Sequence, residues 1–252
     1  MTDDVTKHSI ALPWERALEK TFWPVLGEIW EDLKKLYAAW RDNILIAGYK
    51  KIVNKDDWKK ANLRVTRDVF RNGSFTDEAI CAEYFWWILA SSRSDDWRDD
   101  NAIQYVDVIK SLSSRQLHLH YVIYNSLNKI LIRQWQYVNV LLSSDIQSKS
   151  VRFFAQEILS KVWETAGLDL NILYKQWLLI EYKTQIHQID DSHAVQYMMA
   201  KPTTFWVLLY AMSHNKFNEY STFSSADFWN FDEIILPEWF AWSLEELLSF
   251  IA

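Results

Sequence analysis

Residues 76–127 have the sequence TDEAICAEYFWWILASSRSDDWRDDNAIQYVDVIKSLSSRQLHLHYVIYNSL, and this stretch decides the predicted fold. Apolar residues recur at spacings of three and four in three segments, 80–88, 103–109 and 117–127. This period is typical of helices that bury one face. Ser113 and Gln116 have the spacing of a capping box at the start of the third segment. We therefore predict three helices joined by short connections.

The same stretch resembles the Abi-alpha family of helical bacterial proteins, which are linked to abortive infection. The resemblance rests on residues 88–91 (ILAS) and 105–113 (YVDVIKSLS), and it extends to the segments 23–52 and 202–215. Gln116 stands where the family usually has an acidic residue, and Trp206 stands where we expect glycine. The resemblance implies a role in defence against phage, and it supplies no catalytic residue.

Glycine and proline are scarce, with 4 of each among 252 residues. All-β and α/β folds use glycine in tight turns and phosphate loops, so this scarcity favours long helices. Hydrophobic residues make up 50% of the chain and charged residues 24%, as in a globular protein. We predict a mainly α fold, a bundle of roughly eight helices, with a small mixed α/β element after residue 200 as an open alternative.

The second half of the chain gives weaker signals. We predict one helix from Ser148 or Ser150 through Trp163, stopped by Gly167, and another that begins at Asp169 and extends to about Ile186. The run 203–209 fits a helix or a strand, and possible helix starts follow at Pro237 and Ser243. A soft boundary near residues 143–150 would divide the chain into regions 1–147 and 148–252, although one continuous domain fits equally well.

Charge and cysteine content exclude several classes of function. The net charge is −6 and the pI is near 5.5, which disfavours a nucleic-acid partner; the basic residues 50–71 fit a solvated helix face. Cys81 is the only cysteine, so we expect a buried thiol without a disulfide. From these residues we expect no signal peptide, no apolar span of membrane length and no phosphate-binding loop. We expect a cytoplasmic protein without a membrane span or cofactors.

Two aromatic regions are candidates for binding a protein partner. In the first, Trp23, Trp30, Tyr37 and Trp40 lie on a heptad-like seam that runs to Ala47. In the second, the C-terminal segment, the candidates are Trp239 and Trp242. Both regions fit packing inside the protein as well as contact with a partner or a second copy.

Arg115 and His120 are the catalytic candidates in this sequence. Their spacing resembles the Arg-x4–6-His motif of the helical HEPN ribonucleases, in which histidine moves a proton and arginine stabilises phosphate charge. A match of this kind also arises by chance in a chain of this length. We predict no metal site, because His118 and His120 lie on different sides of a helix and the acidic run 95–100 lacks the glycine and glutamate of a calcium loop.

The sequence therefore predicts a non-catalytic helical protein of bacterial antiphage defence that acts through protein–protein contacts. One alternative is a HEPN-like ribonuclease effector that uses Arg115 and His120. Another is an immunity protein or an assembly subunit that binds through one of the aromatic regions.

Overall fold

The computed structural model describes residues 60–73, 79–94, 100–161, 165–214, 222–228, 230–231 and 234–251. The predicted aromatic seam from Trp23 to Ala47 lies outside these residues. So do residues 50–59 of the basic stretch and residues 95–99 of the acidic run.

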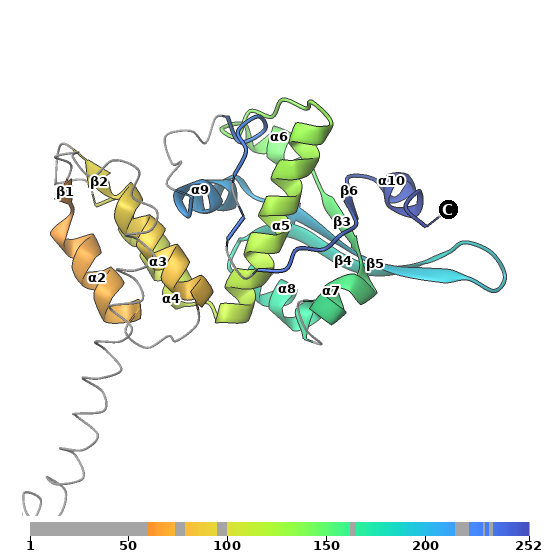
Figure 1. The fold of residues 1–252 in the computed structure, drawn as a ribbon, viewed down its shortest axis with the longest axis horizontal. Coiled ribbons are helices and arrows are strands. Elements are labelled where there is room, and N and C mark those ends of the chain that lie inside the picture. The colour runs from red at the N-terminus through yellow and green to blue at the C-terminus, as the bar shows by residue number, and fades with distance from the viewer. Residues whose placement is uncertain are drawn as a thin grey trace, which may run out of the picture.

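Three helices form the first described part of the fold. Helices α2 (Leu63–Gly73), α3 (Ala79–Ser91) and α4 (Ile103–Lys110) pack on one another beside the short antiparallel pair of β1 (Lys60–Ala61) and β2 (Arg93–Ser94) (Figure 1). Asn62 caps α2, because its side-chain oxygen accepts hydrogen bonds from the backbone N–H groups of Arg64 at 2.8 Å and Val65 at 3.3 Å. The helices predicted around segments 80–88 and 103–109 are thus confirmed as α3 and α4.

Helix α5 (Ser114–Arg133) is the centre of the molecule. The predicted capping box at its start is confirmed: the Gln116 N–H donates to Ser113 Oγ at 3.3 Å, and the Ser113 N–H donates to Gln116 Oε1 at 3.0 Å. Helix α5 contacts α3 as well as the strands and helices that follow it in the chain. Its side chains are buried on nearly all sides between Leu117 and Leu131, as expected of a helix inside the core.

An antiparallel sheet occupies the second half of the described chain. Its strands are β3 (Val151–Phe154), β4 (Leu179–Gln188), β5 (Ala194–Pro202) and β6 (Phe240–Ala241), in the order β4-β5-β3-β6. Within β5, only residues 197–200 pair with β3. The half of the β4–β5 hairpin nearest its turn therefore extends beyond the other strands, and Figure 1 shows it projecting from the body of the molecule.

Helices cover both faces of the sheet. Helices α6 (Ser143–Gln147), α7 (Ala155–Lys161), α8 (Ala166–Lys175) and α10 (Leu244–Leu248) contact its strands, whereas α9 (Thr204–Met212) packs against α3 and α5. On one face Phe153, Met198 and Ala200 join the main core that α5 and α8 share. On the other face Tyr197 and Met199 pack against Leu247 of α10. The sheet is thus a middle layer between helices.

The predicted mainly α bundle is wrong, because this antiparallel sheet makes the fold a mixture of helices and strands. The helix expected from Asp169 to about Ile186 ends at Lys175. Trp177 then takes a positive φ of 59°, which turns the chain out of the helix, and β4 begins at Leu179. The mixed element expected after residue 200 is also misplaced, because most of the strand residues lie before residue 200.

Other expectations for the second half had mixed outcomes. The segment expected to form a helix from Ser148 or Ser150 begins with β3, and Gly167 lies in the first turn of α8. Residues 203–209, left open between helix and strand, belong to α9 and its N-cap. Pro237 starts no helix. Ser243 does cap α10, because its Oγ accepts from the N–H of Glu246 at 3.1 Å.

Candidate functional site

Arg115 and His120 both lie on α5, but the structure does not bring them together. Residues five apart on an α-helix point about 140° apart. The Arg115 side chain is 51% exposed, and its Nε lies 3.7 Å from Oδ2 of the buried Asp169. His120 is only 1% exposed. The arginine therefore takes part in a contact between α5 and α8, while the histidine lies in the core.

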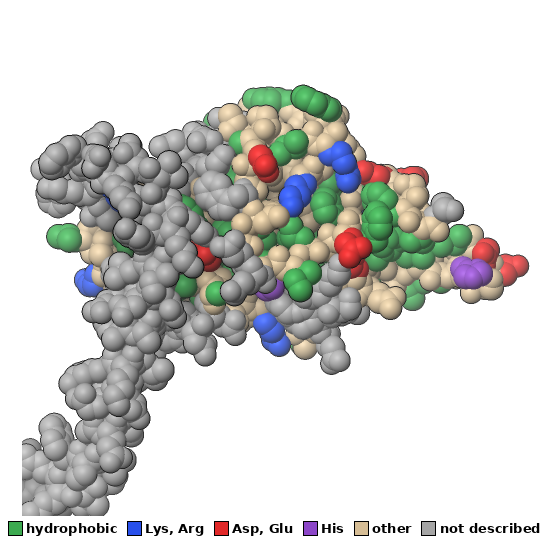
Figure 2. Space-filling view, in the orientation of Figure 1, with side chains coloured by type: hydrophobic (Ala, Val, Ile, Leu, Met, Phe, Trp, Pro, Cys, Tyr) green, Lys and Arg blue, Asp and Glu red, His purple; other side chains and the backbone are tan. Residues whose placement is uncertain are grey.

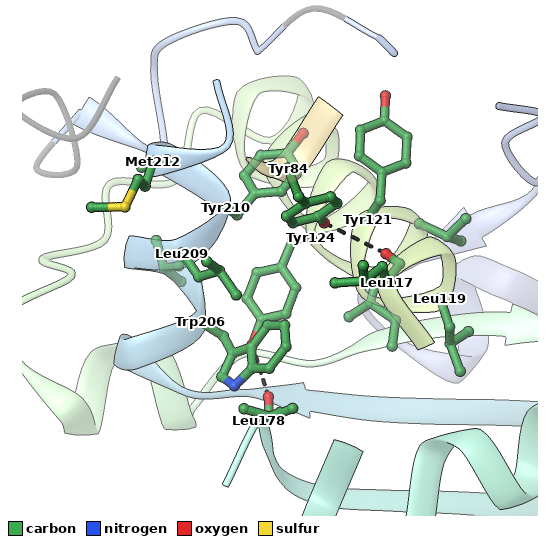
Figure 3. Close-up of a cluster of buried hydrophobic side chains, with 14 of the residues drawn as sticks. Tyr84, Leu117, Leu119, Tyr121, Tyr124, Leu178, Trp206, Leu209, Tyr210 and Met212 are labelled. Carbon is green, nitrogen blue, oxygen red and sulfur yellow. Dashed lines mark hydrogen bonds between the residues drawn. The ribbon is translucent and has the colours of Figure 1, made fainter. Parts of the chain in front are cut away.

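Aromatic side chains surround His120. Its ring centroid lies 3.8 Å from that of Trp206 and 4.7 Å from that of Tyr124, and the Tyr84 hydroxyl forms a short hydrogen bond with its Nδ1. Figure 3 shows Tyr84, Tyr124 and Trp206 meeting in this cluster from α3, α5 and α9. Burial holds the pKa of His120 well below its usual value. The His120 side chain is thus enclosed in the core rather than open to an RNA phosphate.

A buried polar network lies beside this cluster and ties α5 to later parts of the chain. Asn125 Nδ2 donates to the Tyr210 hydroxyl at 2.9 Å, and the Phe231 N–H donates to the Tyr121 hydroxyl at 2.8 Å. The Tyr124 hydroxyl donates to the Leu178 carbonyl at 3.1 Å, drawn as a dashed line in Figure 3. Buried polar groups of this kind are costly unless paired, so these contacts fix how α9 and the C-terminal segment pack.

Lowering the pH from neutral to about 5 is expected to destabilise the fold through His120. Burial depresses the pKa of His120 in the folded state below the ordinary value of 6.5, which applies to the unfolded chain. Protonation of His120 therefore favours unfolding. Above pH 6.5 His120 leaves the free energy of unfolding unchanged. As the pH falls below 6.5, this free energy decreases by at most about 1.4 kcal/mol per pH unit. Urea unfolding at several pH values measures the slope.

The variant His120→Leu isolates this effect. It should unfold with a shallower pH dependence than the unchanged chain, whatever its absolute stability. Leu119→Ala is the matched control, because Leu119 is also buried on α5 but carries no titratable group, and it should keep the original slope. Equal slopes in all three proteins would contradict a neutral, buried His120.

The aromatic candidates near the C-terminus are only partly exposed. Trp239 is 43% exposed, and its ring lies 4.9 Å from that of Phe250. Trp242 packs against the main core, and Lys149 Nζ lies 4.2 Å from its ring centroid. The other candidates, Trp23, Trp30, Tyr37 and Trp40, lie outside the described residues.

The connection between α5 and α6 carries a more exposed apolar surface. In this segment, residues 135–142, which we name the apolar loop, Trp135 is 94% exposed, Tyr137 75%, Leu141 63% and Leu142 52%. Figure 2 shows hydrophobic side chains along the upper edge of the molecule, where Figure 1 places this connection. Apolar groups gathered on a surface in this way are typical of interaction sites.

Backbone hydrogen bonds hold the apolar loop in place. Trp135 has a φ of 52° and ends α5 in a Schellman motif, in which the N–H groups of Trp135 and Gln136 donate to the carbonyls of Ile132 and Leu131 at 3.2 and 3.0 Å. Val138 and Val140 are fully buried and anchor the loop to the core. The exposed side chains therefore project from a fixed backbone.

Trp135 occupies a position at which glycine is the usual residue. The left-handed conformation costs an ordinary L-residue about 1–2 kcal/mol, and the exposed indole recovers little of this by packing. Backbone strain of this kind gathers at functional sites. The surrounding sequence from Gln134 to Ser144 contains no charged residue. This uncharged, aromatic-rich run at the end of a long helix is the signal in the sequence that marks the site.

No group of three or more His, Cys, Asp and Glu side chains in the described parts of the chain is placed to hold a metal ion. Across the same residues, no helix combines the length and apolar character needed to cross a membrane.

Comparisons of the chain with protein families, with curated proteins and with solved structures found no match.

Proposed function

We propose that this protein acts in bacterial antiphage defence through a protein–protein contact made by the apolar loop, without catalysis of its own. The proposal places this contact in the bacterial cytoplasm. The resemblance of residues 76–127 to the Abi-alpha family supports the setting. The observation that carries the contact is the gathering of exposed apolar side chains on one short segment, where Trp135 at 94% exposure is accompanied by Tyr137, Leu141 and Leu142.

The composition and rigidity of the apolar loop favour a protein as its partner. Tryptophan and tyrosine are over-represented among the residues that dominate binding energy in protein interfaces. Trp135 and Tyr137 supply both types, and Leu141 and Leu142 add apolar area beside them. Because the backbone is already held by the Schellman motif and the buried valines, binding would cost little additional ordering.

The geometry of Arg115 and His120 does not favour a ribonuclease. An RNA-cleaving histidine must reach the ribose or phosphate, and His120 is enclosed by Tyr84, Tyr124 and Trp206. Arg115 is directed toward Asp169 instead. We therefore propose only the function that acts through a protein–protein contact.

Phage plating on a bacterial host that expresses this chain tests the proposal, with growth of the culture followed in parallel. A drop in plaque number relative to a host with an empty vector supports a defence function that needs no other foreign protein. Protection that appears only when neighbouring genes are added would support an immunity protein or an assembly subunit. Unchanged plating under both conditions, across a panel of unrelated phages, would contradict the proposed role in defence.

A further inference from the structure

Strand β4 presents a long edge to its surroundings. It lies at the end of the strand order and pairs with β5 on one side, while no described strand lies on the other. Its ten residues run from Leu179 to Gln188, and the part nearest the turn projects from the body in Figure 1. Every second residue of such an edge directs an N–H and a C=O outward, which makes the edge a template for another strand.

We infer that two copies of this chain pair through β4, antiparallel, about a two-fold axis that passes midway between the two copies of Thr184. The two sheets then form one continuous sheet across the dimer. An axis perpendicular to the sheet keeps each side chain on its own face, so residues placed symmetrically about Thr184 lie opposite one another.

The polar face of β4 is complementary to itself in this register. Glu181 lies opposite His187 of the second copy, and a carboxylate accepts from an imidazole N–H. Lys183 lies opposite Gln185, whose amide oxygen accepts from the ammonium. Hydrogen bonds from Lys183 and Lys201, at 2.5 and 2.6 Å, lower the pKa of Glu181 to about 2, so its carboxylate is ionised at neutral pH. No pair of like charges is opposed directly.

In the same register, the second copy covers exposed apolar side chains on the other face of β4. Ile186 is 72% exposed on an edge strand, and the register places it opposite Tyr182 of the second copy. Tyr182 already packs against the core and lies edge-on to Tyr174, with ring centroids 5.9 Å apart. Pairs of an aromatic and a β-branched residue are among the favourable cross-strand pairs, and symmetry supplies this one twice.

Neighbouring registers are less favourable. An axis at Lys183 places two lysines opposite one another, which is destabilising. With an axis at Gln185, Lys183 lies opposite His187 of the second copy. Glu181 then lies opposite Ile189, which is beyond the end of β4. An axis at Tyr182 pairs Glu181 with Lys183, but it uses the irregular start of β4 between Leu179 and Glu181 and leaves Ile186 uncovered. The register centred on Thr184 avoids all three defects.

Cysteine cross-linking tests the register directly. In a dimer centred on Thr184, the two copies of a Thr184→Cys variant have Cβ atoms about 5 Å apart, so mild oxidation with diamide should link them. In Gln188→Cys the same atoms are about 27 Å apart and should stay unlinked. The natural Cys81 is buried and should not interfere. Equal linking of the two variants, or linking of neither, would overturn the inference.

The mass in solution gives a second test that does not depend on disulfide formation. The full chain should show a dimer by light scattering after size exclusion. Ile186→Lys should weaken that dimer about tenfold, because it removes two cross-strand pairs. Ile235→Lys is the matched control, since Ile235 is 64% exposed and belongs to no strand of the sheet, and it should leave the dimer unchanged. A monomer at all concentrations, or equal effects of both variants, would overturn the inference. The dimer is independent of the proposed role in defence.

Discussion

Substitution of Trp206 by alanine should lower the free energy of unfolding by about 3–5 kcal/mol, the cost of truncating a large aromatic side chain in a packed core. Trp206 is fully buried on α9 and lies against His120 and Tyr124 of α5. Its loss leaves a cavity between the two helices, where Figure 3 shows the Trp206 ring beside Tyr124. Urea unfolding of the two proteins measures the difference.

The matched control for Trp206→Ala is Trp135→Ala. It removes the same side chain at a position that is 94% exposed, so the free energy of unfolding should change by no more than about 0.5 kcal/mol. A comparable loss of stability in the two variants would mean that the burial of Trp206 and the exposure of Trp135 are wrongly assigned.

Trp135→Gly should leave the protein as stable as before or stabilise it by up to about 1 kcal/mol, although it removes the largest side chain of the apolar loop. Glycine takes the left-handed conformation without the steric cost that Trp135 bears at its φ of 52°. Part of this gain is offset because glycine raises the entropy of the unfolded chain. Urea unfolding checks the sign of the change.

Trp177→Gly provides an internal comparison for this prediction. Trp177 also ends a helix in a Schellman motif, with a φ of 59° and 83% exposure. The two glycine variants should therefore change stability by similar amounts. A large loss of stability in Trp135→Gly alone would show that its indole packs against the protein, and the apolar loop would then not be a free surface.

The two variants should differ in binding if the proposed function is correct. Removal of a tryptophan at the centre of an interface typically costs about 2 kcal/mol or more of binding free energy, or roughly a thirtyfold loss of affinity. Trp135→Gly should show this loss toward the partner of the apolar loop. Trp177 lies outside that loop, so its variant should bind as the unchanged chain does.

The helices α3, α4 and α5 could be predicted because their signals are local. Each has apolar residues at helical spacing, and the start of α5 is marked by Ser113 and Gln116, whose side chains make the bonds that the spacing implies. The burial of Cys81 was predicted correctly for the same reason, because its neighbours on α3 are apolar.

The sheet could not be predicted as easily because its signals depend on distant partners. Helix α8 ends at Lys175 without a glycine, and Trp177 takes the left-handed position that glycine normally marks. By spacing alone, the apolar residues of β4 therefore predict a continued helix. One local signal was available: Asp190 accepts from the N–H groups of Ser192 and His193 at 2.8 Å, which is the behaviour of an aspartate in a turn.

The candidate site shows the limits of motif spacing. Arg115 and His120 matched a known spacing, yet position around α5 separates an exposed arginine from a buried histidine. Trp206, where the family resemblance led us to expect glycine, turns out to fill the core beside that histidine. The apolar loop matched no motif, and its character depends on exposure, which the sequence does not state directly.

The most direct test of the account is the plating efficiency of phage on hosts that express the unchanged chain, Trp135→Gly or Trp177→Gly at equal levels. We expect Trp135→Gly to lose protection while its stability is unchanged or increased, and Trp177→Gly to protect as the unchanged chain does. Full protection by a folded Trp135→Gly variant would contradict the claim that this protein acts through the apolar loop.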